Sequence, residues 1–321
     1  MAGLTREFTQ TARIASGAVL GWSLVRLGIA ESARKDVLAA QGVSCISFHD
    51  PSPLLFERCI RWLLGNGFSF ISEDDIIAIA EGRTRPGAGA AWVSLDDGWR
   101  GNLDLLPVIE RYRVPVTIFL ATDAVENLGL FWWTCVYDHR AELPDPLRRS
   151  VLRIWGIPET ERRELVEPLV RGHVGEYTRQ ALTIDEVQSL AESGLVSFGS
   201  HTVRHPSLPQ CDAGQLEEEL RDSKDSIEAW TGRPVKSLAY PRNQFDGRER
   251  TVLVRCGYEL AATVEERAYR PGLDDAYFVP RLAVGEDSFF SANICKMVGA
   301  WRPYVGWVQR PLSIVRPCFH R

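Results

Sequence analysis

Short apolar runs alternate with amphipathic stretches along most of the chain after residue 43. The runs at 43–50, 90–99 and 114–122 each end in polar or turn-forming residues, a pattern that is typical of buried parallel strands. Helix signals stand between them. Ser72 followed by "EDDIIAIAEG" resembles an N-cap with acidic residues in the first turn and a glycine exit. Strands that alternate with helices predict an α/β fold with a parallel sheet, either open or closed as a barrel.

The alternation breaks between about residues 124 and 182, where "GLFWWTCVYDHR" and "ETERRELVEPLVRG" indicate a mostly helical insertion. Regular strands return with "LVSFGSH", "VKSLAYP" and "AYFVPRLAV". We therefore expect a barrel domain over 41–290, a helical N-terminal extension over 1–40 and a helical tail over 291–321. The aromatic run of the insertion has two interpretations. It either forms a lid or sugar-stacking wall or simply anchors the insertion, and its residues are Phe131, Trp132 and Trp133.

The N-terminal segment is apolar from residue 14 to residue 30 but contains Arg26. A signal peptide has an uninterrupted apolar core, and a spanning helix needs about 20 apolar residues. We expect instead an amphipathic helix that packs on the domain or lies on a membrane surface. The C-terminal "MVGAWRPYVGWVQRPLSIVRP" is similar, so peripheral membrane contact through both segments is left open. The expected location is the cytoplasm, with the inner membrane surface as the place of that contact.

Composition and charge limit the classes of protein to which the chain can belong. The chain has 321 residues, 45% of them hydrophobic and 25% charged, which suits a soluble globular protein of one large or two smaller domains. A net charge of -5 provides no basic field for nucleic acid. The seven cysteines are scattered, with no paired spacing, and so favour reduced thiols over a disulfide framework. Oligomeric state is not specified by any of these features.

Polar residues with catalytic potential follow five of the predicted strands, at the rim where such residues gather in α/β sheets and barrels. One carboxylate with two imidazoles makes a three-ligand set for catalytic Zn, or for Fe, Co or Ni. Such an ion lowers the pKa of water and polarises a carbonyl, and a second aspartate can accept the proton. Each motif alone also has a structural explanation, as a turn, a core histidine or a surface ion pair. The residues are His49, Asp50, Asp96, Asp97, His201, His205, Tyr240, Pro241, Arg242 and Arg281.

At this point the sequence resembles a known family. The segments "SLDDGWRGN", "SHTVRHPSL" and "LAYPRNQFD", in this order, are similar to the NodB-homology polysaccharide deacetylases of carbohydrate esterase family four. The earlier "ISFHDPSPLLFERCIRWLLGNGFSFIS" is also similar to that family's opening strand and helix, and the resemblance covers about residues 43–285. It implies a distorted (β/α)7 barrel with a helical insertion. It also implies hydrolysis of an N-acetyl group on an amino sugar, polysaccharide or glycan precursor, with release of acetate.

Carried over residue by residue, the resemblance implies that Asp97, His201 and His205 bind a divalent metal, zinc above the alternatives. Asp96 would be the general base. The backbone N–H of Arg242 would donate to the developing oxyanion. Arg281, in "VPRLAV", would orient Asp96 and keep it ionised.

The sequence departs from the family pattern in several places. Leu95 stands where phenylalanine is commoner, a change we expect to be harmless. Arg242 and Asn243 replace an aromatic and a glycine, so a cationic side chain either meets an anionic substrate or faces solvent. No leucine–histidine pair follows Arg281, and His49 is therefore nominated as the general acid, with metal-bound water or Asp96 as the alternative carrier of that proton. Two alternatives stay open: a carbohydrate-binding barrel that has lost catalysis, and an amide hydrolase with a non-sugar substrate.

Overall fold

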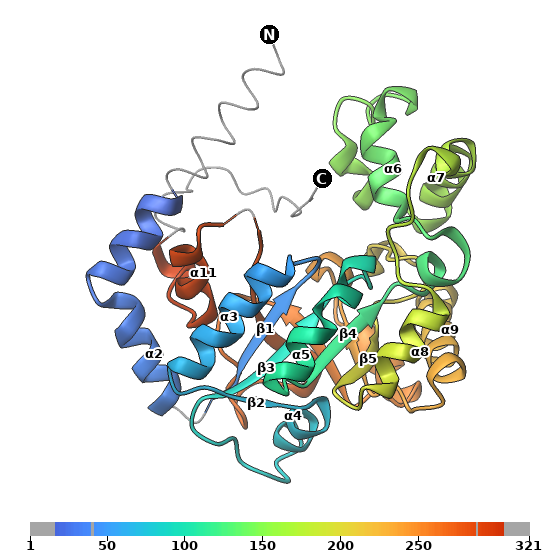
Figure 1. Cartoon of the computed structure of the whole chain (residues 1–321). Coiled ribbons are helices and arrows are strands. Elements are labelled where there is room, and N and C mark those ends of the chain that lie inside the picture. Colours follow the sequence, from blue (N-terminus) through green and yellow to red (C-terminus); the bar gives the residue numbers. More distant parts are fainter. Residues whose placement is uncertain (1–16, 40–41, 287, 305–321) are drawn as a thin grey trace. The chain divides into compact units, whose positions relative to one another are not determined.

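A computed structural model describes residues 17–39, 42–286 and 288–304. The chain forms two compact units. The first consists of residues 1–94, 264–275 and 279–321, and the second of 95–263 and 276–278. Most of the N-terminal apolar segment is described, but the C-terminal one lies outside the described residues from 305 onward. Figure 1 shows the predicted alternation of strands and helices along the chain.

The first unit contains four strands in the order β8–β1–β3–β2. β1 and β8 pair in parallel with Ile46 opposite Leu282, and β2 and β3 pair in parallel with Ser69 opposite Ala90. The strands are β1 (Ser44–Phe48), β2 (Ser69–Ile71), β3 (Ala90–Leu95) and β8 (Val279–Ala283). The helices are residues 17–26, α2 (Ile29–Ala39), α3 (Pro53–Gly65), α4 (Glu73–Ala80) and α11 (Phe290–Met297).

Local sequence explains where these helices begin. The Ser72 hydroxyl accepts from the Asp75 N–H, and the Asp75 carboxylate accepts from the Ser72 N–H, which is a complete capping box at the predicted start of α4. α3 begins with a serine cap followed by proline at the first helical position. Its residues Phe56, Ile60 and Leu63 recur at helical spacing and are fully buried, so they fix which face of α3 meets the core.

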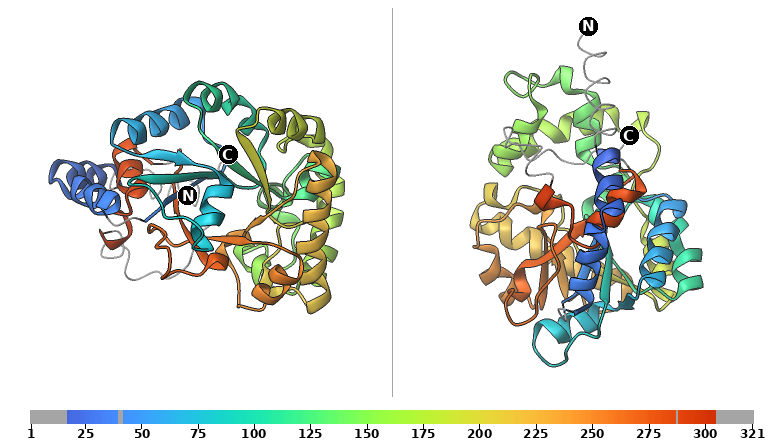
Figure 2. Two further views of the ribbon diagram at one scale, coloured as in Figure 1. Left: turned by 90° about the horizontal axis from the view of Figure 1, so that it is seen from below. Right: turned by 90° about the vertical axis from the view of Figure 1, so that its left-hand side faces the viewer.

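The second unit contains strands in the order β4–β5–β6–β7, and every pairing among them is parallel. Parallel strands end at the same edge of a sheet, so the loops after β5 and β6 lie at one edge. Helices α8 and α9 pack against β5 (Figures 1 and 2). The strands are β4 (Val116–Leu120), β5 (Val196–Ser200), β6 (Ser237–Ala239) and β7 (Leu260–Val264). The helices are η1 (Arg100–Leu105), α5 (Leu106–Tyr112), α8 (Ile184–Glu192), η6 (Leu208–Gln210), α9 (Ala213–Thr231), η7 (Pro241–Asn243), α10 (Glu249–Arg255) and η8 (Ala276–Phe278).

The segment between β4 and α8 is built of helices and turns, as its sequence predicts. Phe131, Trp132 and Trp133 are all buried, and the Phe131 and Trp133 rings stack with centroids 4.8 Å apart. The buried Arg162 guanidinium lies 4.3 Å from the Trp132 ring. These contacts favour the anchoring interpretation of the aromatic run. The helices are η2 (Ala124–Leu128), α6 (Trp132–Asp138), η3 (Arg140–Glu142), η4 (Val151–Gly156), α7 (Glu159–His173) and η5 (Val174–Glu176).

The helix at 17–26 has one buried and one exposed apolar side. Leu24 is buried, whereas Val19 and Trp22 are exposed. Within the described ranges, no helix is both long enough and apolar enough to cross a bilayer.

Candidate metal centre

Three buried side chains converge at the ends of β3 and β5. Asp97 follows β3 by two residues, His201 directly follows β5, and His205 stands four residues further on. Asp97 Oδ1 lies 3.4 Å from His201 Nε2 and 3.6 Å from His205 Nε2. One ligand atom from each of the three residues lies within 4.8 Å of the others. The structure therefore brings together the three residues that the sequence selects as a ligand set.

The loops that carry these residues have unusual backbone. Asp97 has φ 73°, Thr202 has φ 68° and His205 has φ 50°, all in the left-handed region. The Thr202 hydroxyl accepts from the His205 N–H at 3.0 Å, and the Ser200 hydroxyl accepts from the Thr202 N–H at 3.0 Å. His205 is thus held by a loop and not by a helix, in agreement with the proline that follows it.

Neighbouring groups fix the direction of two candidate ligands. The Trp99 indole donates to Asp97 Oδ2 at 2.9 Å, which leaves Oδ1 facing the two imidazoles. His201 Nδ1 lies 2.7 Å from the Ala239 carbonyl oxygen. A carbonyl only accepts, so Nδ1 carries a proton and Nε2 is the ring nitrogen that can bind a metal. Sequence reasoning missed Trp99, although it directly follows the "DDG" turn.

The donor set fits a divalent cation. Tetrahedral ligands about 2.0–2.1 Å from zinc lie roughly 3.3–3.4 Å apart, close to the spacing between Asp97 and the two imidazoles. Burial lowers the pKa of His205 well below its usual value, so the imidazole is neutral as a ligand must be. Burial acts in the same direction on His201, but the hydrogen bond to Asp97 and the charge of Asp96 outweigh it and raise that pKa. His205 Nδ1 is buried, with no hydrogen-bond partner among the described residues.

Asp96 and Arg242 accompany this cluster. Asp96 is buried, and its charge reaches His201. Arg242 follows β6 in η7, and its guanidinium lies 4.1 Å from the Trp155 ring. Burial lowers the pKa of Arg242 to about 10. The side chain is half-buried against an aromatic ring, and its role toward a substrate stays a prediction.

Aromatic residues of the insertion pack on the loop that carries His205. The Trp133 ring lies 4.4 Å from the His205 ring, and the Trp155 ring lies 5.7 Å from it. The Trp132 indole donates to the Arg204 carbonyl at 2.9 Å. Trp155, which also faces Arg242, was not identified from the sequence because nothing local in "VLRIWG" distinguishes it from an ordinary core residue.

A buried glutamate of α9 supports the same loop from the other side. One oxygen of Glu219 accepts from the Val203 N–H at 2.9 Å and from the Arg204 N–H at 2.8 Å. Burial raises the pKa of this carboxyl group. Sequence reasoning missed Glu219, which directly follows the exposed Glu218. The available signal was its position on the buried stripe of α9, three residues after Leu216 and one before Leu220.

Two further sequence-selected residues, Arg281 and His49, belong to the first unit. Arg281 was expected after a strand, and this is wrong: it lies within β8, because the apolar run continues through Leu282. Its side chain is 1% exposed and donates to the Ser94 hydroxyl at 2.9 Å, so it is not a surface ion pair. His49 directly follows β1, as predicted, and is half-buried. The catalytic roles of Arg281 and His49 stay predictions.

Comparisons with known proteins agree with this geometry. The sequence model described as polysaccharide deacetylase matches residues 83–261, more than half of the chain. A poly-beta-1,6-N-acetyl-D-glucosamine N-deacetylase from Staphylococcus aureus (strain MRSA252) is 19% identical over 246 residues, which cover 73% of this chain and 67% of that protein. A protein of the same name from Staphylococcus epidermidis is 20% identical over 243 residues, which cover 73% of this chain and 68% of that protein.

Two solved structures extend the comparison to the fold. The Streptococcus pyogenes deacetylase PplD, in complex with acetate, is 16% identical with a TM-score of 0.57, over 80% of this chain and 97% of that one. IcaB from Ammonifex degensii is 18% identical with a TM-score of 0.56, over 81% of this chain and 96% of that one. These likenesses confirm the predicted deformed parallel barrel of the NodB-homology type. Together with the match over residues 83–261, they show that the chain belongs to the polysaccharide deacetylase family.

Proposed function

We propose that the protein hydrolyses N-acetyl groups on an N-acetylated polysaccharide in a metal-dependent reaction. The observation that carries this proposal is the convergence of Asp97, His201 and His205, with His201 Nε2 oriented by the Ala239 carbonyl. A buried carboxylate and two imidazoles need not face one another in an ordinary core. Membership of the polysaccharide deacetylase family supports the reaction class.

The proposed reaction needs three roles: metal binding, proton transfer from water and stabilisation of the developing oxyanion. Asp97, His201 and His205 hold the metal, for which their one oxygen and two nitrogen donors favour zinc. A divalent ion bound there supplies Lewis acidity, which polarises an amide carbonyl and acidifies water. Asp96 accepts the proton of the attacking water. The Arg242 N–H donates to the carbonyl oxygen as it gains negative charge, and the amide C–N bond then breaks to give acetate and a free amine.

Two further roles come from the family resemblance. Arg281 is proposed to orient Asp96, and His49 is proposed to protonate the leaving amine. Either assignment would be dropped if its variant (Arg281→Met or His49→Gln) retained full kcat in a protein of unchanged melting temperature.

For the substrate we propose a polymer of N-acetylglucosamine, with β-1,6 linkage as the first choice. The names of the staphylococcal relatives support this choice. The test is acetate release from β-1,6-linked and β-1,4-linked N-acetylglucosamine oligomers of equal length. A faster reaction with the β-1,6 series is expected, and an equal or slower one would contradict this linkage.

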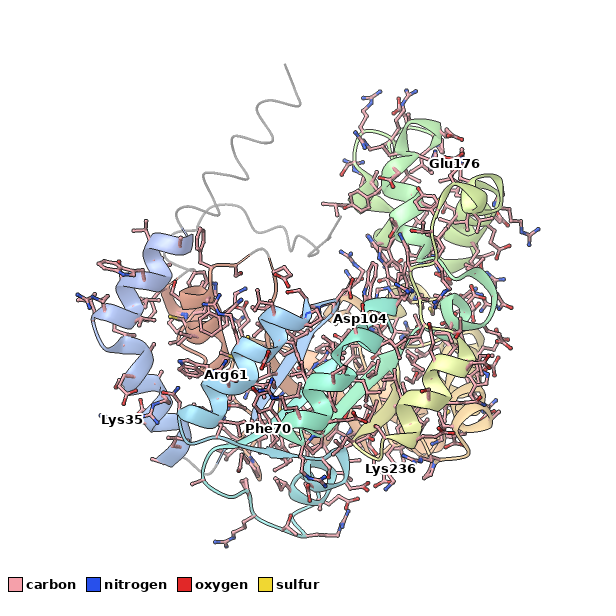
Figure 3. The ribbon with its side chains drawn as sticks, in the orientation of Figure 1. Lys35, Arg61, Phe70, Asp104, Glu176 and Lys236 are labelled. Atoms are coloured by element: carbon pink, nitrogen blue, oxygen red, sulfur yellow. The ribbon has the colours of Figure 1, made fainter. Side chains whose placement is uncertain are left out.

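Metal content and activity should be measured on the same preparations. Asp97→Asn is expected to lose the ion of the candidate metal centre together with acetate release, because it removes one of the three ligands there. Asp96→Asn should retain the ion and lose about 10²–10⁴-fold in kcat, the range for a general base. Asp104 is exposed on η1, and Asp104→Asn is the matched control that should keep both the ion and the activity (Figure 3). Undiminished acetate release from metal-free Asp97→Asn would refute the mechanism.

We also propose that the protein acts inside the cell and touches the membrane surface through its N-terminal segment. Val19, Trp22 and Leu27 are 66%, 60% and 74% exposed, and the Arg26 guanidinium lies 5.7 Å from the Trp22 ring. Exposed apolar and aromatic side chains beside a cation are typical of interfacial helices. Sedimentation with anionic phospholipid vesicles tests this. Trp22→Ser should reduce the bound fraction, and equal binding by both proteins would contradict it.

A further inference from the structure

The helical insertion contains two copies of the same short motif. "HRAE" spans residues 139–142 and "HVGE" spans residues 173–176. His139 caps the end of α6 and His173 is the last residue of α7, and in both cases a 3-10 turn then ends on the glutamate. Figure 3 places Glu176 at the end of the insertion away from β4 and β5. The two copies therefore bring two histidines and two glutamates to one place on the second unit.

The four side chains form a closed arrangement. The His139 and His173 rings stack with centroids 3.5 Å apart and an interplanar angle of 20°. Glu142 lies at one edge of the stack, 3.3 Å from His139 Nδ1 and 3.0 Å from His173 Nε2. Glu176 lies at the opposite edge, 3.6 Å from His139 Nε2 and 2.7 Å from His173 Nδ1. All four ring nitrogens thus face a carboxylate.

Only the two His173 contacts, to Glu142 at 3.2 Å and to Glu176 at 2.7 Å, have hydrogen-bond geometry, whereas the His139 nitrogens lie 3.3 and 3.6 Å from the same carboxylates. A neutral imidazole carries one N–H and one lone pair, so two neutral rings offer two donors to four nitrogen–carboxylate contacts. Two lone pairs must then face carboxylate oxygens, which only accept when ionised. Protonating both rings would supply the donors, but it would place two positive charges face to face in the stack at 3.5 Å. A cation bound by Glu142 and one nitrogen of each ring would occupy both lone pairs and leave both rings neutral.

We propose that His139 Nδ1, His173 Nε2 and Glu142 bind a divalent cation, with zinc as the best fit, and that Glu176 orients both rings from the opposite edge. One ligand atom from each of the first three residues lies within 4.8 Å of the others. The two nitrogen–oxygen distances on this edge, 3.3 and 3.0 Å, are near the spacing of about 3.3 Å between ligands of tetrahedral zinc. Glu176 would accept the remaining ring N–H groups, the usual outer partner of a metal-bound histidine.

The position of this second site indicates a structural role. The histidine side chains are 18% and 21% exposed, so an ion can reach them from solvent. An ion there joins the C-terminal ends of α6 and α7, which already pack against each other. α6 begins with Trp132 and Trp133, whose rings lie against the loop of the candidate metal centre. The second ion would therefore hold the insertion in shape, whatever reaction the protein performs.

Zinc titration of the full-length protein tests this directly. Chelator-treated protein is titrated with Zn²⁺ against a chromophoric competitor, and bound zinc per chain is counted. Wild type should bind two ions, and Asp97→Asn and Glu142→Gln should each bind one. Glu176→Gln should retain two, with one of them about 10–100-fold weaker, as for loss of an outer partner. Glu164→Gln, an exposed change on the same helix α7, is the matched control and should bind two.

The two metal sites are separated by working in the Asp97→Asn background. There Zn²⁺ should still raise the melting temperature, and adding Glu142→Gln should abolish that rise. Glu142 is 53% exposed, so its replacement by glutamine leaves the core intact. No zinc bound by Asp97→Asn, or the same affinity after Glu142→Gln is added, would overturn the second site. Two ions bound by Asp97→Asn would instead speak against the candidate metal centre and leave the second site standing.

Discussion

Replacing Glu219 by alanine is the most direct test of how the His205 loop is held. The change leaves the N–H groups of Val203 and Arg204 without their acceptor, 2.9 and 2.8 Å away in the native protein. A buried donor left without a partner costs about 1–3 kcal/mol, which gives roughly 2–6 kcal/mol for two. Water can reach part of this loop, so we expect a loss of about 3 kcal/mol from the free energy of unfolding, out of the 5–15 kcal/mol that is usual for a native protein.

Urea unfolding of Glu219→Ala, Glu219→Gln and Glu218→Ala measures this loss. Glu219→Gln keeps an oxygen for both donors, so about half of the loss is expected. Glu218 is the exposed neighbour on α9 and should change stability by no more than about 0.5 kcal/mol. Because this loop positions His205, Glu219→Ala should also weaken metal binding at the candidate metal centre about 10–100-fold. Equal midpoints for Glu219→Ala and Glu218→Ala would refute the reasoning.

Three further predictions concern single positions. Gly199→Ala would place a Cβ 2.5 Å from the Phe119 ring and should cost about 1–3 kcal/mol in urea unfolding, and an unchanged midpoint would contradict this packing. Burial raises the pKa of Asp274, but hydrogen bonds from Arg267 and a backbone N–H outweigh it and hold that pKa below its ordinary value. The resulting stability is present above the unfolded pKa of about 3.9 and is lost as pH falls below it. In Asp274→Asn the free energy of unfolding should therefore fall less steeply between about pH 5 and about pH 3 than in the wild type. The same fall in both proteins would contradict a lowered pKa of Asp274. Arg242→Met keeps the backbone N–H and should lower kcat less than tenfold. A hundredfold loss would show that the guanidinium, and not the backbone N–H alone, is needed for the reaction.

Strands and the chemistry at their ends were predictable because their signals are local. The run before Asp97 is wholly buried in β3, and the exit after β5 carries both histidines. Each candidate ligand was recognisable from its residue type and its position after an apolar run. Their meeting at one edge followed from the rule that parallel strands end together.

Other parts of the site depended on contacts that no local pattern encodes. Trp155 reaches Arg242 and His205 from a 3-10 turn with no periodicity to mark it. Arg281 was expected at the end of a strand, whereas it lies inside β8. Pro280 lacks only an N–H, and the extended backbone continues through it. Strand ends were thus set by long-range pairing, which a single sequence does not display.

The left-handed backbone at Asp97 and His205 bears on protein engineering. An ordinary L-residue held at positive φ costs about 1 kcal/mol or more, and here the surrounding loops hold two candidate metal ligands in that conformation. A designer who transplants only an aspartate and two histidines onto another α/β scaffold would find each side chain aimed elsewhere. The portable unit is the pair of strand-to-loop junctions, including Trp99 and the hydroxyls of Ser200 and Thr202.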